Sequence, residues 1–427
     1  MDDVETHPQR RPPIVVTSVK IEVVDGADKG ASAVGSDLVM SVGTAKDNAL
    51  VLGDITVSRY HLEVTARRGG ILVTDLDSTN GTYCGVVRID RAIVPPGTLV
   101  RAGTTTLRVD EASRSTMPTI GSGMYAGMIA RTPQMMKLFG DIERVAPTGT
   151  SILIVGESGT GKERVAEAIH AGSRRSSAPL VTIDCGALPS NLVASELFGH
   201  EKGAFTGADR THIGSFERAG EGTVFLDEIG ELPQADQAAL LGVLERKRFR
   251  RVGGTADIEL RARVLAATNR DLRVEVNHGR FRHDLYHRLA VVVLRLPPLR
   301  ERPDDIPLLV AHFARELGAS GELDDVFGVE LLARWKRNPW SGNIRELRNA
   351  VEAALIVGHE GDSVEFFSES ADVPAYKEAR AAQLLTFEHA YLTRLLQAAE
   401  GNVSQASRLA RMDRSHLIDL LQRHRLK

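Results

Sequence analysis

The stretch Ser151–His170, SILIVGESGTGKERVAEAIH, passes from an apolar segment through a glycine-rich loop into a helix-forming segment. The loop fits the P-loop pattern in its required context, with a strand before it and a helix after it. Its glycines let backbone N–H groups close around phosphate oxygens, and the helix N-terminus adds its dipole. The phosphate-binding residues expected from this pattern are Gly156, Glu157, Ser158, Gly159, Thr160, Gly161, Lys162 and Glu163.

A second segment supplies acidic groups. The P-loop pattern expects Ser or Thr after its lysine, for Mg²⁺, but this position holds Glu163. The apolar strand GTVFLDE, residues 222–228, ends in Asp227 and Glu228, which fits the Walker B arrangement. We expect Asp227 to hold Mg²⁺, directly or through water, and Glu228 to deprotonate the attacking water. An apolar strand followed by Asp-Glu is also an ordinary helix start, but its place downstream of a P-loop favours catalysis.

The chain divides into three blocks and two linkers. The first block has short apolar segments separated by Gly, Asp and Asn, which predicts an all-β sandwich. The second alternates apolar strands with helices, which predicts a parallel α/β sheet, and turns helical from about residue 298. The third has helical periodicity. The expected ranges are 14–110 for the sandwich, 111–127 for a linker, 128–358 for the α/β domain and its helical lid, 359–383 for a second linker, and 384–427 for the helical block.

Composition excludes several classes of protein. The net charge of -3 gives no overall signal for polyanion binding, so any nucleic-acid surface must be local. Cys84 and Cys185 lack CxxC spacing, which argues against a disulfide framework or a zinc site. The polar N-terminus has no signal-peptide core, and no apolar run approaches the length of a membrane span. We therefore expect a cytoplasmic protein with no membrane partner.

Further motifs follow the P-loop in a fixed order. They read GESGTGKE, SELFGHEKGAFTGA, GTVFLDEIGELP, AATNRDL, FRHDLYHRL, LPPLRERPDDI and PWSGNIRELRN. From about residue 130 to 358 the chain thus strongly resembles the AAA+ ATPase domain of bacterial sigma-54-dependent transcription activators. The resemblance implies an ATP-hydrolysing domain with a helical lid, and ATP and Mg²⁺ as its cofactors.

The resemblance also assigns a purpose to the glycine-rich segment within SELFGHEKGAFTGA. In this family the GAFTGA loop is the tip that touches sigma-54 in the RNA polymerase holoenzyme, and ATP turnover raises and lowers it. Composition alone would favour a core position for the phenylalanine, beside a flexible turn. The residues implied to contact sigma-54 are Gly203, Ala204, Phe205, Thr206, Gly207 and Ala208.

Four more residues acquire catalytic roles by resemblance. Asn269 matches the sensor I position, which reads the γ-phosphate, and Arg345 matches sensor II in the lid. Arg282 and Arg288 match the arginine fingers, which stabilise charge in phosphoryl transfer at a neighbour's nucleotide. Fingers supplied in trans imply a homo-oligomeric ring, expected to be a hexamer. Without the family, two arginines on one helix are ordinary solvated surface.

Asp184 departs from the family pattern. Relatives usually have Asn there, and that Asn hydrogen-bonds the Walker B glutamate, here Glu228. An ionised Asp has no donor. Either Asp184 is protonated beside Glu228 or the switch works differently in this chain.

The last block resembles the Fis-type helix-turn-helix that ends these activators. An amphipathic helix, Glu388–Ala399, precedes two short helical segments, VSQASRLAR and RSHLIDLLQRH. From Arg380 onward, 8 Arg and Lys face 4 Asp and Glu, which suits a DNA backbone. The resemblance implies base contacts from Arg414, Ser415 and His416 and phosphate contacts from Ser404 and Gln405. A helical dimerisation tail is the alternative.

The first block resembles a forkhead-associated (FHA) domain, through Gly43, Ser58, Arg59, His61, Asn80 and Gly81. The resemblance implies that Ser58 and Arg59 bind the phosphate of a phosphothreonine, that Asn80 binds the peptide backbone, and that His61 is a structural hydrogen-bonder. Thr44 stands where the family usually has Arg, which removes one phosphate ligand. The partner implied is a phosphothreonine protein or a serine/threonine kinase. The alternative is a sandwich that binds no phosphopeptide.

Together these features predict a multidomain protein: an all-β FHA sandwich, an α/β AAA+ P-loop ATPase with a helical lid, and an all-α helix-turn-helix. The predicted function is ATP-dependent activation of sigma-54 RNA polymerase from upstream DNA. Two alternatives are an AAA+ remodelling ATPase with another protein client, such as an unfoldase or helicase loader, and a DNA-binding regulator with weak ATPase. The intact GAFTGA hexapeptide disfavours the first, and the full set of catalytic residues disfavours the second.

Overall fold

The computed structural model describes most of the first 357 residues and isolated parts of the last block. The described residues are 14–35, 39–67, 69–117, 124–319, 321, 323–357, 392, 395, 399, 402–410, 412, 417, 420 and 421. The chain forms two compact units, residues 1–362 and 363–427. Within the described ranges, no helix combines the length and the apolar character that a membrane crossing requires.

The N-terminal part is the all-β sandwich that the sequence predicts. One sheet has the strand order β2-β1-β11-β10-β7-β8 and the other β4-β3-β5-β6-β9. Their inward side chains, such as Ile21, Val64 and Leu107, are fully buried between the sheets. The strand bounds are β1 Ile14–Asp25, β2 Ser32–Gly35, β3 Met40–Gly43, β4 Leu50–Val51, β5 Leu62–Arg67, β6 Gly70–Asp75, β7 Thr82–Cys84, β8 Val87–Ile89, β9 Arg91–Val94, β10 Thr98–Ala102 and β11 Thr105–Met117.

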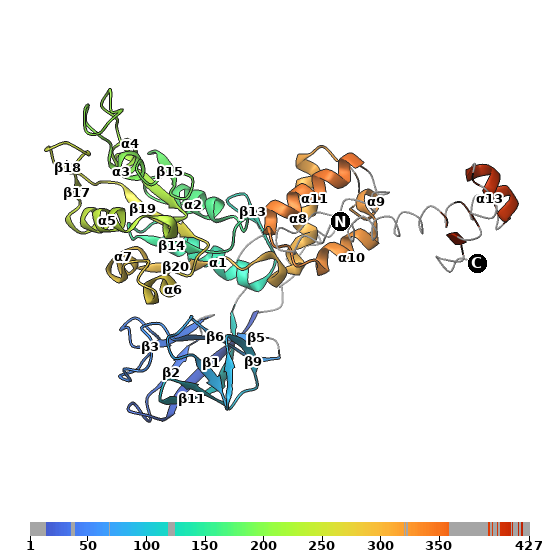
Figure 1. Cartoon of the computed structure of the whole chain (residues 1–427), viewed down its shortest axis with the longest axis horizontal. Helices are drawn as coiled ribbons and strands as arrows, with labels where there is room; N and C mark the ends of the chain where they lie inside the picture. Colours follow the sequence, from blue (N-terminus) through green and yellow to red (C-terminus); the bar gives the residue numbers. More distant parts are fainter. Residues whose placement is uncertain are drawn as a thin grey trace, which may run out of the picture. The chain divides into compact units, whose positions relative to one another are not determined.

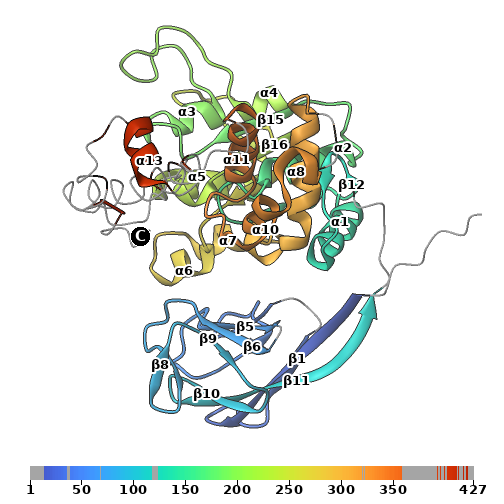
Figure 2. The same ribbon diagram turned by 90° about the vertical axis from the view of Figure 1, so that its right-hand side faces the viewer.

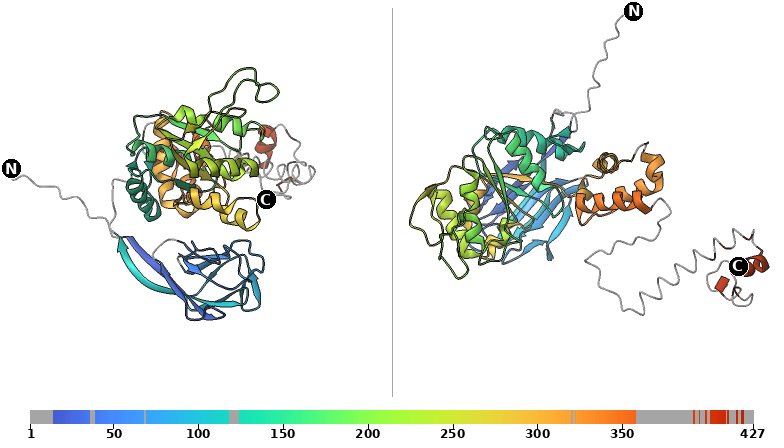
Figure 3. Two further views of the ribbon diagram at one scale, coloured as in Figure 1. Left: turned by 90° about the vertical axis from the view of Figure 1, so that its left-hand side faces the viewer. Right: turned by 90° about the horizontal axis from the view of Figure 1, so that it is seen from above.

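Strand β11 extends into the segment expected to be a linker, 111–127. It pairs antiparallel with β1 as far as Met117, opposite Ile14, and Figure 3 shows the two long strands side by side, β1 in blue and β11 in cyan. A short hairpin of β12 (Met124–Tyr125) and β13 (Met128–Ile129) follows. The polar composition of 111–117 did not indicate a strand, because its partner is a segment almost a hundred residues earlier rather than an apolar core.

The central domain contains a five-stranded parallel sheet in the order β15-β16-β19-β14-β20 (Figure 1). Apolar side chains fill both faces, which is characteristic of a parallel sheet. Leu153 and Ala266 face one apolar cluster, whereas Ile154 and Leu265 face the other. The strand bounds are β14 Ile152–Val155, β15 Leu180–Asp184, β16 Thr223–Asp227, β19 Arg263–Thr268 and β20 Val292–Arg295.

Helices cover both faces of this sheet. The face of Ile154 packs against α1 (Pro133–Val145) and α2 (Lys162–Ala171). The other face packs against the remaining helices of the domain. These are α3 Val193–Phe198, α4 Ser215–Ala219, α5 Gln234–Arg246, α6 Leu272–Asn277 and α7 His283–Leu289. A 3₁₀ turn, η1 (Ile229–Glu231), and a hairpin of β17 (Arg248–Phe249) and β18 (Ile258–Glu259) complete the domain.

A helical subdomain follows β20, as the sequence predicts for the lid. Two 3₁₀ turns, η2 (Leu299–Glu301) and η3 (Pro303–Asp305), lead into α8 (Ile306–Glu316), α9 (Leu323–Phe327), α10 (Val329–Arg337) and α11 (Asn343–Val357). Its separate apolar core includes Phe313, Trp335 and Trp340. This core stabilises the lid independently of the sheet.

The second compact unit is described only in part. Helix α13 (Val403–Ala410) includes Ser404 and Gln405, and the Gln405 side chain is exposed. An apolar core joins Ala406 of this helix to buried residues on both sides along the chain: Leu392, Leu395, Ala399, Leu417, Leu420 and Leu421. The predicted DNA contacts Arg414, Ser415 and His416, and the predicted linker 359–383, lie outside the described residues.

Candidate functional site

The P-loop lies at the carboxyl end of β14, beside the lid. The Gly156 N–H donates to the Thr268 carbonyl at 3.2 Å, which ties the loop to the neighbouring strand. Gly159 has φ of 75°, and a Cβ there would lie 2.2 Å from the Gly342 carbonyl oxygen of the lid. Gly161 has φ of 104° and precedes α2. Glycine is therefore required at 159 both by its left-handed conformation and by the close approach of the lid backbone.

Lys162 and Glu228 meet at this edge of the sheet. The buried Lys162 ammonium donates to Glu228 Oε1 and to the Gly156 carbonyl, both at 3.1 Å. The other Glu228 oxygen, Oε2, accepts the Asn269 backbone N–H at 3.0 Å. Glu228 has φ of 48°, a conformation uncommon outside glycine that turns its side chain toward the P-loop. The predicted phosphate-binding residue Lys162 and the predicted catalytic residues Glu228 and Asn269, from three separate elements, thus come together, Asn269 through its backbone N–H.

Asp227 lies next to this pair, half-buried at the end of β16. Burial raises the pKa of its carboxyl group, and the neighbouring charges of Glu228 and Asp184 raise it further. A nearby cation stabilises the ionised form of a carboxylate whose charge is disfavoured in this way. Asp227 therefore has the chemistry that would suit a ligand of Mg²⁺.

Asp184 does not contact Glu228 through a hydrogen bond. Its Oδ1 accepts the backbone N–H groups of Gly186 at 2.9 Å and Ala187 at 3.1 Å, and its side chain is exposed. These bonds need an acceptor and no donor, so an ionised Asp satisfies them. Of the two possibilities left open by the sequence, the structure favours the second: Glu228 is held by Lys162 and Asn269.

The lid contributes polar groups that the sequence analysis missed. Asn343, fully buried with φ of 54°, donates from Nδ2 to Glu157 Oε2 at 3.2 Å and to the Ser158 carbonyl at 3.0 Å. Its Oδ1 accepts the Leu299 N–H at 2.8 Å. Asn343 lies within the quoted GNIREL motif, but only the fold shows that one amide joins the lid to the P-loop.

Three arginines also link the lid to the P-loop. The exposed Arg345, predicted as sensor II, donates to Ser158 Oγ at 3.3 Å. Arg300 forms a bidentate ion pair with Glu157, which lowers the pKa of that carboxyl. Arg302, which the sequence analysis did not single out, is buried and donates to the Thr160 carbonyl at 3.2 Å. Lid position and P-loop shape are therefore mechanically coupled.

The predicted arginine fingers lie at the two ends of α7, and both are exposed. Arg282 pairs with Asp284, at 2.7 Å from Nη2 to Oδ2, and Arg288 donates to the Leu244 carbonyl at 3.3 Å. Neither contact involves a P-loop residue. Their exposure suits a role toward a second protomer rather than toward the nucleotide site of their own.

The GAFTGA segment is the tip of a long loop between α3 and α4 (Figure 2). A tight turn closes it, with Gly203 N–H to the Ala208 carbonyl at 2.8 Å and Ala208 N–H to the Phe205 carbonyl at 3.0 Å. Thr206 is exposed, and 37% of Phe205 is accessible, with its ring edge against His200. Phe205 is therefore a surface residue, as the resemblance implies.

The base of this loop is braced by the neighbouring β17–β18 connection. Val252 N–H donates to the Gly199 carbonyl at 2.9 Å, and Glu201 N–H donates to the Val252 carbonyl at 3.0 Å. Arg251 pairs with Glu201 at 2.9 Å and with Glu217 at 2.7 Å. Arg251 is a further residue that the motifs did not single out. These contacts hold the base of the loop, so that its tip projects from the domain in a fixed position.

The sandwich residues predicted to bind phosphothreonine lie on neighbouring loops. Asn80 donates to the Thr56 carbonyl at 2.7 Å, and Ser58 Oγ accepts the Thr79 N–H at 3.0 Å. His61, fully buried, accepts the Ser58 N–H at 3.1 Å, as a structural hydrogen-bonder does. Burial lowers the pKa of His61, which keeps its ring neutral. Arg59 is exposed and its side chain is available to an anion.

Comparisons with known proteins identify the family. Residues 128–295 match the "Sigma-54 interaction domain" family and residues 300–380 the "AAA+ ATPase lid domain". The transcriptional regulatory protein GlrR of Escherichia coli K12 is 39% identical over 325 residues, which cover 74% of this chain and 72% of GlrR. This chain belongs to the sigma-54-dependent transcriptional regulators. ZraR of the same organism is 42% identical over 319 residues, covering 72% of this chain and 70% of ZraR.

Solved structures agree for the central part. NtrX from Brucella abortus in complex with ADP is 32% identical and superimposes with a TM-score of 0.51, covering 71% of this chain and 70% of NtrX. The central domain is thus an AAA+ domain, as predicted. Residues 22–113 match the family "Inner membrane component of T3SS, cytoplasmic domain". The sandwich is also similar to a solved phosphothreonine-dependent FHA domain, 29% identical, over 23% of this chain and 99% of that one, with a TM-score of 0.21.

Proposed function

We propose that this sigma-54-dependent regulator uses ATP hydrolysis to remodel the closed complex of sigma-54 RNA polymerase from upstream DNA. One observation supports this most: Phe205 and Thr206 are exposed on a braced loop of the domain that also holds Lys162 and Glu228. A work-producing loop and a hydrolytic centre on one rigid domain are what ATP-driven remodelling requires.

In the proposed reaction the P-loop backbone and Lys162 bind the β- and γ-phosphates of ATP. Asp227 would hold Mg²⁺, whose positive charge would help to neutralise charge that develops on the phosphates. A phosphate that binds Lys162 replaces its contact with Glu228, which leaves Glu228 available to deprotonate the attacking water. Asn269 follows Thr268, whose carbonyl is bonded to the P-loop, and so lies where it can sense the γ-phosphate.

Arg282 and Arg288 act on the nucleotide of a neighbouring protomer in this proposal. Their exposure on α7 and their lack of a P-loop contact support action in trans. Reciprocal contacts of this type close a ring, proposed to be a hexamer. The lid is proposed to follow the state of the nucleotide in its own protomer, because Arg345 and Asn343 contact the P-loop.

The two parts that flank the central domain are proposed to bind a regulatory phosphopeptide and upstream DNA. The sandwich is proposed to take a phosphothreonine peptide at Ser58, Arg59 and Asn80, and the exposed Arg59 supports this. The C-terminal unit, with the basic excess of its sequence, is proposed to be a helix-turn-helix that binds upstream DNA. Ser404, Gln405, Arg414, Ser415 and His416 are its proposed contacts.

The test uses the full chain with ADP and a metal fluoride, which mimics the transition state, and sigma-54 on a native gel. We expect a nucleotide-dependent complex, lost in Phe205→Ala and Thr206→Ala, with ATP turnover retained in both. Arg210→Ala is the matched control, since Arg210 is exposed in the same loop but outside the turn. ATP turnover with no sigma-54 complex in the wild type would favour the alternative, a remodelling ATPase with another client.

A further inference from the structure

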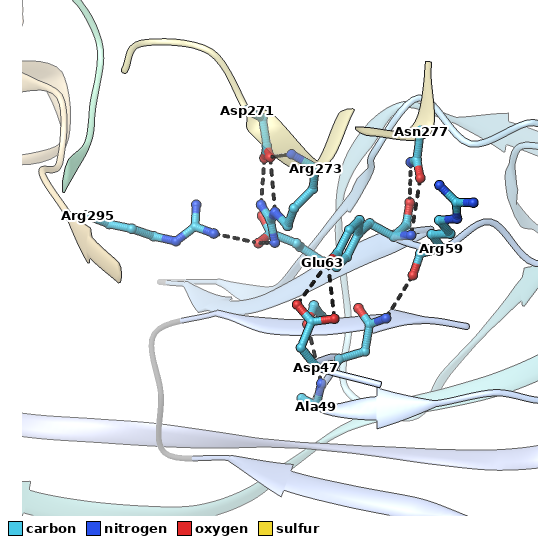
Figure 4. Close-up of polar contacts among 11 residues, drawn as sticks. Asp47, Ala49, Arg59, Glu63, Asp271, Arg273, Asn277 and Arg295 are labelled. Atoms are coloured by element: carbon cyan, nitrogen blue, oxygen red, sulfur yellow. Dashed lines mark hydrogen bonds and ion pairs between the residues drawn. The ribbon is translucent and has the colours of Figure 1, made fainter. Parts of the chain in front are cut away.

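The sandwich and the central domain share a built interface, which involves β5 and the helices α6 and α7. Glu63 on β5 accepts from Arg273 of α6 and, at 3.2 Å, from Arg295 of β20 (Figure 4). The side chains of Arg273 and Glu63 are only 6% and 13% exposed. Asp271 pairs with Arg273 from the other side. Buried charges with satisfied partners mark a specific contact rather than a loose encounter.

A second set of contacts fixes the loop before β5. The Asn277 side chain donates to the Tyr60 carbonyl at 2.6 Å and to the Leu76 carbonyl at 3.2 Å, and it accepts the Tyr60 N–H at 3.3 Å (Figure 4). The Tyr60 ring, 1% exposed, packs edge-on against Tyr286 of α7, with centroids 5.7 Å apart. These contacts therefore hold the loop that contains Tyr60 in one position against α6 and α7.

This arrangement of the loop and the helices brings three side chains that can bind a metal together across the interface. Asp47 belongs to the sandwich, and His283 and His287 lie one turn apart on α7. One ligand atom from each falls within 4.8 Å of the others. The two Nε2 atoms are 2.8 Å apart, and His287 Nε2 is 3.8 Å from Asp47 Oδ1. Nothing in the proposed nucleotide or sigma-54 chemistry uses these three groups.

The separations suit a small divalent ion. Zn²⁺ bonds to imidazole nitrogen and carboxylate oxygen at about 2.0–2.2 Å. In a tetrahedral site these bond lengths place neighbouring ligand atoms roughly 3.3 Å apart. That value lies between the 2.8 Å that separates the two histidine Nε2 atoms and the 3.8 Å from His287 Nε2 to Asp47 Oδ1. Histidines at i and i+4 project from the same side of a helix, so both rings reach one ion without moving the backbone. Small side-chain rotations are enough to complete the geometry.

The surroundings prepare these ligands for a metal ion. The buried Tyr60 hydroxyl donates to both Asp47 oxygens, at 3.1 Å and 2.9 Å, and so orients the carboxylate, as outer partners of metal sites do.

The space beside the histidines is open. His283 and His287 line a cleft of about 370 Å³ together with Thr44, Ala45, Lys46 and Arg59. That volume leaves room for a water or an anion as fourth ligand, with Lys46 and Arg59 favouring an anion. Three protein ligands and one open position are common in zinc chemistry.

We propose that Asp47, His283 and His287 form a binding site for a divalent transition-metal ion, with Zn²⁺ as the probe, that clamps the sandwich onto α7. This goes beyond the proposed function and does not depend on it. The cysteine pattern says nothing about such a site, because its ligands come from two domains and include no thiolate. Since Arg282 directly precedes α7 and Arg288 lies in it, the bound ion fixes the sandwich beside the proposed fingers.

The test titrates Zn²⁺ into the full-length protein without nucleotide, by calorimetry, and follows Co²⁺ by absorption. We expect one ion per chain and the intense visible bands of four-coordinate Co²⁺. Outer-shell changes alone cost 10–100-fold in metal affinity, so loss of a ligand in His287→Ala or Asp47→Asn should weaken binding by roughly 100-fold or more. Asp47→Asn keeps the acceptor for Tyr60 and tests the charge alone.

His278→Ala is the matched control. His278 pairs with Asp77 across the same interface at 2.9 Å but lies outside the cluster, so its loss should leave Zn²⁺ affinity unchanged. Tyr60→Phe, which keeps the ring and removes the hydroxyl that orients Asp47, should weaken binding by about tenfold. Equal Zn²⁺ affinity in the wild type and in Asp47→Asn overturns the cross-domain site, because it shows that the two histidines bind the ion without Asp47. Absence of wild-type binding at micromolar Zn²⁺ overturns it altogether.

Discussion

Lys162 Nζ lies 3.1 Å from Glu228 Oε1, so the P-loop lysine and the proposed catalytic base neutralise each other. The Lys162 side chain is 7% exposed and that of Glu228 is 23% exposed, which makes the pair a partly buried one. We propose that a bound phosphate competes with Glu228 for the Lys162 ammonium, which would couple nucleotide binding to release of the base.

Glu228→Gln should therefore separate binding from hydrolysis. The amide keeps the size of the side chain but cannot take a proton, and it competes less strongly for Lys162. We expect ATP affinity equal to or above that of the wild type, and turnover lower by about 10²–10⁴-fold. Calorimetric titration and phosphate release measure the two quantities. Glu245→Gln, an exposed site on α5, is the control, and near-normal turnover in Glu228→Gln would contradict the assigned role.

Asp227→Asn should stabilise the protein at neutral pH while removing Mg²⁺-dependent turnover. Burial raises the folded-state pKa of Asp227 above the unfolded value, about 3.9. The folded state is thus favoured while the group is protonated, and this advantage is lost as the pH rises through the folded pKa. Thermal unfolding without nucleotide should give a higher Tm for Asp227→Asn at pH 7. The difference should shrink as the pH falls through the folded pKa and vanish only well below the unfolded pKa of about 3.9. A lower Tm at pH 7 would refute the argument.

Asn343 should prove necessary for the lid to engage the P-loop. Asn343→Gly removes the amide but tolerates φ of 54°, whereas Asn343→Ala adds backbone strain of about 1–3 kcal/mol. We expect both variants to bind ATP more weakly, and the Ala variant to unfold at the lower denaturant concentration. Arg337→Ala, exposed at the end of α10, serves as the control. Identical stability of the Gly and Ala variants would argue against the strained conformation.

Arg288→Ala tests whether the fingers act in trans. The variant alone should lose about 10³-fold or more of its turnover while retaining ATP binding. Lys162→Ala should be inactive for a different reason, loss of phosphate binding. Mixing the two variants should restore part of the activity, because a ring then contains sites with an intact P-loop beside a protomer with an intact finger. Failure of every mixing ratio to restore turnover points to action within one protomer.

Local patterns predicted much of the nucleotide site. The P-loop and the strand ending in Asp227 and Glu228 are short motifs whose geometry follows from backbone rules, so their meeting at the sheet edge was predictable. Asn343, Arg302 and Arg251 were not predicted. Each acts on a segment distant in sequence, and a single sequence gives no sign of which distant backbone a buried amide or guanidinium meets.

The linker expected at 111–127 was wrong for its first seven residues for a related reason. Strand β11 runs to Met117 because the start of β1 offers a partner for its backbone hydrogen bonds. Composition reports whether a segment buries apolar area. It does not report whether a distant strand edge is available for pairing.

The sequence by itself determined the parallel sheet, the P-loop and the helical lid, since each depends on residues close together in the chain. The exposure of Phe205 was expected from the family resemblance, because composition alone favoured a core position. Tertiary structure alone decided which partners the charged groups take: Glu228 with Lys162, Asn343 with the P-loop, and Asp47 with two histidines of α7. Such pairings depend on how separate elements pack. Packing satisfies buried polar groups through contacts that local periodicity does not encode.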